Sequence, residues 1–115
     1  MSHARSERVA GLLRRELANI VQREMEHELP SLISITDVEV SRDLSHAKVY
    51  VSALEIEHGA EIAKTLNEAS GQIRHELAGR IRLRLVPTLR FLHDTSSESG
   101  QRIEQLLAAS RRKPD

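Results

Sequence analysis

The chain contains no cysteine and no tryptophan, and one tyrosine, Tyr50, and one phenylalanine, Phe91, are its aromatic residues. The lack of cysteine excludes disulfides, thiolate zinc sites and thiol nucleophiles. The scarcity of aromatic residues excludes a set of stacking platforms, which domains that grip single-stranded nucleic acid use to hold bases. If this chain binds RNA, it has to use close backbone approach, charge and the shape of a folded RNA.

Long apolar runs and the residue patterns of catalytic sites are also lacking. No segment approaches the ~18 apolar residues of a membrane span, and Met1–Glu7 lacks the apolar core of a signal peptide. The six histidines are scattered, and none forms a metal-type pair at helical spacing. There is no P-loop and no nucleophile elbow. We therefore expect a cytoplasmic protein that is not an enzyme, with no membrane contact, metal, cofactor or small-molecule substrate.

Charge is abundant, and its two signs are separated along the chain. Residues 1–23 carry a net charge of +3, residues 24–68 of −7 and residues 69–92 of +4, although the total is zero. Two basic blocks thus flank an acidic one. Such blocks suit phosphate binding, and they equally suit ordinary solvated faces.

Hydrophobic periodicity predicts that the chain begins with an amphipathic helix. From about Arg5 to Glu28 the apolar residues recur on one helical face. Arg8 and Arg15 lie seven residues apart, so they share the opposite, exposed face. The helix is expected to end before Pro30, because proline disfavours a helical residue in front of it.

A β-hairpin is predicted next. Between residues 34 and 54 the hydrophobic period changes to two, and residues 42–45 provide a turn between the two strands. The parity of Ile35 does not match that of Val38. A bulge or kink near Asp37 would reconcile the two.

The helical period returns from about His58 and is interrupted at Ala69-Ser70-Gly71. We predict two helices joined by a tight kink, in which Gly71 takes the left-handed conformation that ends the first helix. Ser70 offers a side-chain cap for the second helix. On this interpretation Gly71→Val should damage the kink, because a β-branched residue resists positive φ.

The second helix is expected to run until Pro87 stops it, and residues 88–93 alternate as a third strand. Capping residues and apolar spacing predict a last helix over 96–110. The order α-β-β-α-kink-α-β-α predicts an α+β fold, a three-stranded sheet covered by helices on one face. We expect a single KH-like domain over residues 1–115, with an ordered core at about 5–108 and a flexible tail at 109–115.

This element order matches the type II KH fold. In ordinary KH domains a GxxG loop between two helices lets the nucleic-acid backbone approach closely. Here Ala69-Ser70-Gly71 occupies that place, one residue shorter and with a single glycine. With two further motifs, the kink resembles the bacterial ribosome-binding factor A family over residues 5–108. These motifs are VSRDLSHAKVYV at 40–51 and RLRLVPTL at 82–89, with Phe91 nearby.

The resemblance implies a non-catalytic assembly factor that binds the small (30S) ribosomal subunit and its 16S rRNA during late maturation. It also implies support for processing of the rRNA 5′ end and a role in cold adaptation. The family's kink falls here on Ala69, Ser70 and Gly71. We expect a monomer as the working form.

The basic residues after the kink add a physical argument for RNA contact. Arg74 and Arg82 fall on one row of the predicted second helix, and Arg80 and Arg84 on another. Free N–H groups at the start of that helix offer a local phosphate site, and we expect recognition of rRNA shape and phosphates. The candidate RNA-binding residues are Ala69, Ser70, Gly71, Arg74, Arg80, Arg82, Arg84, Arg90, Arg8 and Arg15.

Two alternatives stay open from the residues alone. The arginines can pair with the acidic block inside the protein. The whole chain can also be a protein-interaction adaptor that uses a KH-like fold without direct RNA contact, which the zero net charge and the acidic segment 24–68 favour.

Overall fold

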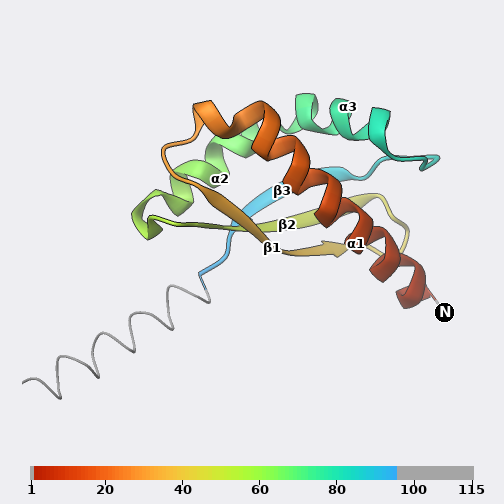
Figure 1. Ribbon diagram of the computed structural model, residues 1–115. Helices are drawn as coiled ribbons and strands as arrows, with labels where there is room; N and C mark the ends of the chain where they lie inside the picture. The colour runs from red at the N-terminus through yellow and green to blue at the C-terminus, as the bar shows by residue number, and fades with distance from the viewer. Residues whose placement is uncertain (1, 96–115) are drawn as a thin grey trace, which may run out of the picture.

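The computed structural model describes residues 2–95 of the chain, with side chains from Ala4 onward (Figure 1). The predicted helix over 96–110 and the predicted tail lie outside these residues. The elements are α1 (Ser2–Ile20), η1 (Val21–Met25), η2 (Glu26–Glu28), β1 (Ile33–Val40), β2 (His46–Ala53), η3 (Ile56–His58), α2 (Gly59–Glu68), α3 (Ser70–Arg80) and β3 (Thr88–His93). None of the described helices is long and apolar enough to cross a membrane.

The three strands form one sheet in the order β1-β2-β3, so β2 is the central strand. β1 pairs antiparallel with β2, and β3 pairs parallel with β2 after the crossover through α2 and α3. The register of β1 on β2 shifts between Ile35 and Asp37. This bulge confirms the predicted irregularity near Asp37, and it allows Ile35 and Val38 to be buried together.

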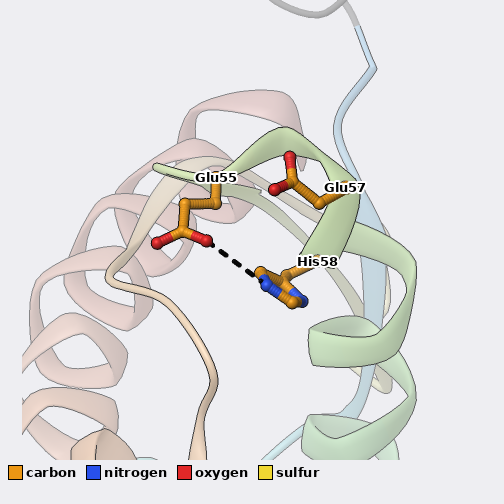
Figure 2. Close-up of side chains that lie close together, drawn as sticks. All are labelled: Glu55, Glu57 and His58. Atoms are coloured by element: carbon orange, nitrogen blue, oxygen red, sulfur yellow. Dashed lines mark ion pairs between the residues drawn. The ribbon is translucent and has the colours of Figure 1, made fainter.

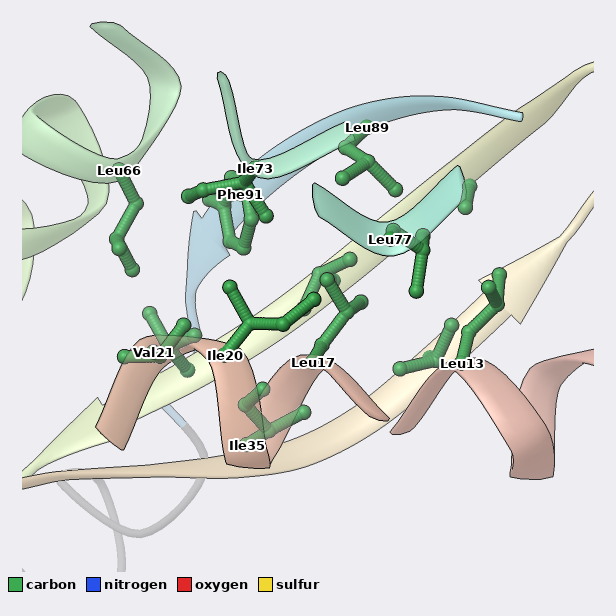
Figure 3. Packing of buried hydrophobic residues seen from close by; sticks show 14 of the residues in the cluster. Leu13, Leu17, Ile20, Val21, Ile35, Leu66, Ile73, Leu77, Leu89 and Phe91 are labelled. Carbon is green, nitrogen blue, oxygen red and sulfur yellow. The ribbon is translucent and has the colours of Figure 1, made fainter. Parts of the chain in front are cut away.

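The helices cover one face of the sheet, as Figure 1 shows. The core lies between the two layers, and Figure 3 shows α1 supplying Leu13, Leu17 and Ile20 to it while Phe91 comes from β3. All four of these side chains are at most 1% exposed. The arrangement confirms the predicted α+β fold, with a three-stranded sheet covered by helices on one face.

The helix break differs from the prediction in its conformation. α2 ends at Glu68 and α3 starts at Ser70, and Ala69 between them has φ −95° and ψ 5°. None of the described glycines has positive φ, so the prediction of a left-handed Gly71 was wrong. The prediction that the Ser70 side chain caps the second helix was also wrong. The N-cap residue of α3 is Ala69, and no side-chain hydrogen bond caps the helix. Gly71 is instead an ordinary exposed residue in the first turn of α3.

The end of α3 also differs from the prediction. The helix stops at Arg80, well before Pro87, and Ile81 is extended at φ −121° and ψ 153°. Ile81 is buried, so the apolar stripe runs on although the helix does not. Arg82 and Arg84 therefore lie on the connection 81–87 and not on helical rows with Arg74 and Arg80.

A Gly71→Ala substitution should raise the free energy of unfolding by about 0.5–1 kcal/mol, because alanine favours the helix over glycine. A Cβ atom at Gly71 would have no heavy atom within 4 Å. Gly79, also in α3 and equally open, provides the matched control, and Gly79→Ala should give a similar gain. Urea unfolding measures both changes. A loss of stability in Gly71→Ala alone would contradict this placement of the residue.

Candidate nucleic-acid interface

The helix break and the arginine-bearing connection lie at opposite ends of α3. Ala69 and Ser70 are half-buried and Gly71 is exposed at the start of the helix. The connection 81–87 follows the other end, and eleven helical residues span roughly 16 Å at 1.5 Å per residue. The structure thus does not bring the kink together with Arg82 and Arg84.

Arg74 holds the connection to α3. Its Nε and Nη2 both donate to the carbonyl oxygen of Val86, at 3.0 and 2.6 Å. These are charge-assisted hydrogen bonds, which are among the stronger ones in proteins. Arg74 is half-buried, and its role in the structure is to hold the connection 81–87 through the Val86 carbonyl. The geometry gives no support to the predicted RNA contact of Arg74.

Arg80 is engaged inside the protein as well. Its Nη1 lies 3.7 Å from Oε1 of Glu16 on α1, and its Nη2 lies 3.8 Å from Oε1 of Glu76. Its Nε is buried and has no hydrogen-bond partner among the described residues. Arg80 is therefore paired inside the protein, but its partners Glu16 and Glu76 lie outside the acidic segment 24–68 that the sequence suggested.

Arg82 and Arg84 are exposed on a connection whose ends are fixed. Ile81 and Pro87 are buried at its two ends. The backbone N–H of Thr88 then donates to the carbonyl of Ser45 at 2.9 Å, which joins the connection to the β1–β2 turn. Two cations are thus displayed on a supported loop beside that turn.

Three segments carry exposed arginines at the same end of the molecule. Figure 1 shows the start of α1, the β1–β2 turn and the connection 81–87 all at that end. We define the basic end as the exposed residues Arg5, Arg8, Arg42, Arg82 and Arg84. Sequence reasoning missed Arg42, because only the folded hairpin places its turn beside the other two segments.

The remaining candidates point elsewhere. Arg15 lies on α1 and lines a groove between that helix and β1. Arg90 is exposed on β3, opposite Lys48 of β2 in the parallel register. Side chains alternate along a strand, and the neighbours Leu89 and Phe91 are buried under the helices. Arg90 consequently belongs to the open face of the sheet.

The outer edge of β3 beside α2 is closed by a side chain. The Asn67 amide nitrogen donates to the carbonyl of Phe91 at 2.8 Å, and its oxygen accepts from the N–H of Phe91 at 2.7 Å. The amide thus satisfies the same pair of backbone groups that a neighbouring strand would use. A shallow groove lies between α2 and β3, lined by Lys64, Asn67 and Phe91 among others, and the Asn67 amide keeps these two backbone groups from pairing with a ligand there.

The opposite end of the molecule is acidic. The end of α1 and the start of α2 lie there, as Figure 1 shows. We define the acidic end as the exposed residues Glu24, Glu26, Glu28, Glu55, Glu57 and Glu61. Figure 2 shows His58 beside Glu55 and Glu57. The His58 ring nitrogens lie 3.3 Å from Glu55 and 3.4 Å from Glu61. Glu55, Glu57 and His58 each offer one ligand atom, and these atoms lie within 4.8 Å of one another, an arrangement that exposed acidic groups commonly show without an ion.

The β1–β2 turn is organised by Asp43. Its Oδ1 accepts from the hydroxyls of Ser45 at 2.7 Å and Ser41 at 2.8 Å, and from the N–H of Ser45 at 3.1 Å. These hydrogen bonds, first among them that of the Ser45 hydroxyl, lower the pKa of Asp43 from 3.8 to about 2. Asp43 thus caps the turn that joins β1 and β2.

Titration of the Asp43 carboxyl by NMR should give a pKa of about 2. Ser45→Ala removes the largest cause and should move the pKa back toward 3.8. The folded pKa lies below the unfolded one, so the carboxylate stabilises the turn above about pH 3.8 and this contribution is lost as the pH falls through about 2. An unchanged pKa in Ser45→Ala would contradict the assigned cause.

Comparison with known proteins shows which family this chain resembles. The family model described as ribosome-binding factor A matches residues 5–107. The ribosome-binding factor A of Xanthomonas euvesicatoria pv. vesicatoria is 49% identical over 107 residues, which are 92% of this chain and 82% of that protein. The one from Halorhodospira halophila is 42% identical over 111 residues, 91% of this chain and 85% of that protein.

Solved structures agree with the sequence comparison. The crystal structure of ribosome-binding factor A from Thermus thermophilus has a TM-score of 0.64 at 33% identity, and covers 76% of this chain and 94% of its own. A homology model of Thermus thermophilus ribosome-binding factor A, fitted into the cryo-EM map of a 30S complex, has a TM-score of 0.63 at 34% identity, and covers 76% of this chain and 92% of its own. This chain belongs to the ribosome-binding factor A family.

Proposed function

We propose that this protein binds the small ribosomal subunit during late maturation and contacts its 16S rRNA through the basic end. The relative from Thermus thermophilus that was fitted into a map of a 30S complex carries this proposal. The basic end provides a physical basis for rRNA binding. Arginines that neutralise phosphates release counterions from the RNA, and this release favours binding. The first amides of α3, at Ser70 and Gly71, can add a phosphate contact.

The chain acts in this proposal by binding and not by catalysis. It works as a monomer in the cytoplasm, recognises rRNA shape and phosphates, and supports processing of the rRNA 5′ end, also in the cold. The side chains at the basic end are arginines, which hold phosphates well. The guanidinium group offers hydrogen-bond donors and no acceptor, so it does not suit general base chemistry.

Density-gradient sedimentation of a cell extract tests the proposal. The protein should travel with free small subunits at low salt, and it should move to the top of the gradient as salt rises. Depletion of the protein should leave 16S rRNA with an unprocessed 5′ end. A protein found only in the free soluble fraction at low salt would sink the proposal.

A further inference from the structure

Two large apolar side chains lie exposed next to each other at the acidic end. Leu32 is 61% exposed and Leu54 is 75% exposed. The backbone N–H of Leu54 donates to the carbonyl of Leu32 at 2.8 Å, so both lie where β1 starts and β2 ends. A single exposed leucine is ordinary, whereas a contiguous apolar patch with a polar rim marks an interaction surface.

The apolar surface continues from this pair into a groove. Its volume is about 630 Å³, and it runs between α1 and the first residues of β1. Leu32 lines the groove together with Val21, Leu29 and Ile33. Because β1 is an outer strand, the groove follows an open edge of the sheet, where an incoming chain finds both apolar side chains and backbone partners.

Carboxylates adjoin the leucines on both sides. Glu26 lines the groove, and so do Arg14 and Arg15, which come earlier, on α1, and therefore nearer the start of that helix at the basic end. Glu28 is exposed on the segment that leads to Leu32. Glu55 directly follows Leu54 and is exposed, and so is Glu57. Phosphates of RNA would be repelled here, whereas lysine or arginine side chains beside an apolar residue would be attracted.

We infer that the Leu32–Leu54 patch, with its rim of Glu26, Glu28, Glu55 and Glu57, binds a protein segment in which large apolar side chains are flanked by lysine or arginine. The patch lies at the end of the molecule opposite the basic end (Figure 1). Both surfaces can therefore be occupied at once, so that the protein joins a cationic protein segment to an anionic partner. The inference stands independently of the rRNA contact.

Fluorescence titration of the full chain with a labelled peptide of alternating lysine and leucine tests the inference. A lysine–serine peptide of equal length and charge should bind much more weakly, since it lacks the apolar side chains. Leu54→Ser and Leu32→Ser should each weaken binding of the lysine–leucine peptide by about tenfold. Leu85→Ser is the matched control, because Leu85 is 56% exposed but lies on the connection at the basic end.

The contribution of the acidic rim to peptide binding can be measured separately. Glu55→Gln together with Glu57→Gln should lower the affinity for the lysine–leucine peptide severalfold at low salt. The double change should also make that affinity depend less on salt concentration. Circular dichroism should show that all these variants stay folded, since the changed side chains are exposed.

Three outcomes would overturn the inference. Equal binding of the two peptides would show attraction by charge alone, and an equal loss in Leu85→Ser would show that the patch is not the site. Peptide binding that appears only after Ile103, Leu106 and Leu107 are changed to serine would identify this chain's own segment as the occupant. Sedimentation with small subunits is scored separately, so its failure would leave the peptide result unaffected.

Discussion

Replacing Arg82 and Arg84 together by glutamine should weaken binding to the small ribosomal subunit by about a hundredfold. Each arginine that contacts a phosphate contributes about 1.5 kcal/mol through a charge-assisted hydrogen bond. Two such contacts amount to about 3 kcal/mol, and every 1.4 kcal/mol is a factor of ten in affinity. Both side chains are exposed on a connection fixed at its ends, so the protein should keep its stability.

A matched pair of exposed cations elsewhere on the protein provides the control. Arg23 on η1 and Lys64 on α2 are exposed but lie outside the basic end. Changing both to glutamine removes the same charge and should alter subunit affinity less than threefold. Titrations at several salt concentrations should also show a shallower salt dependence for the Arg82/Arg84 variant alone. Equal losses in both variants would mean that net charge, and not the basic end, determines binding.

Most of the fold could be predicted because the core side chains repeat at the spacing of their elements. The mismatch in parity between Ile35 and Val38 even located the bulge, since both side chains are buried on the same face. The end of α3 could not be found in this way. Ile81 continues the apolar spacing of Leu77, and a buried residue satisfies that pattern whether its backbone is helical or extended.

The role of each arginine could not be predicted from a basic run in the sequence. Arg80 lies beside Glu16, which is distant in sequence and reaches it only because α1 packs against α3. The partner of Arg74 is a backbone carbonyl, and every residue carries one, so no pattern of side chains marks it. Only the fold shows which cations are displayed together at the basic end, since Arg42 comes from the acidic segment 24–68 and Arg80 of a basic block lies beside Glu16.

Arg74→Met should lower the free energy of unfolding by about 2 kcal/mol, because it removes two charge-assisted hydrogen bonds and leaves the Val86 carbonyl without its partner. Arg74→Lys separates this role from a phosphate contact. A lysine keeps the charge but cannot present two donors in the same fixed geometry, so it should be destabilised nearly as much as the methionine variant.

Urea unfolding and subunit titration together decide between the two roles of Arg74. If Arg74 holds the connection 81–87, both variants lose stability, and both bind more weakly because binding must then also order Arg82 and Arg84, whose phosphate contacts still form in the complex. The salt dependence of binding should then stay that of the unchanged protein, since no phosphate contact is removed at position 74. A different pair of results would instead identify Arg74 as a direct phosphate ligand. In that case Arg74→Lys would be stable and bind fully, and Arg74→Met would show a shallower salt dependence of binding. The geometry favours the first result, because both donors of the guanidinium already point at one carbonyl oxygen.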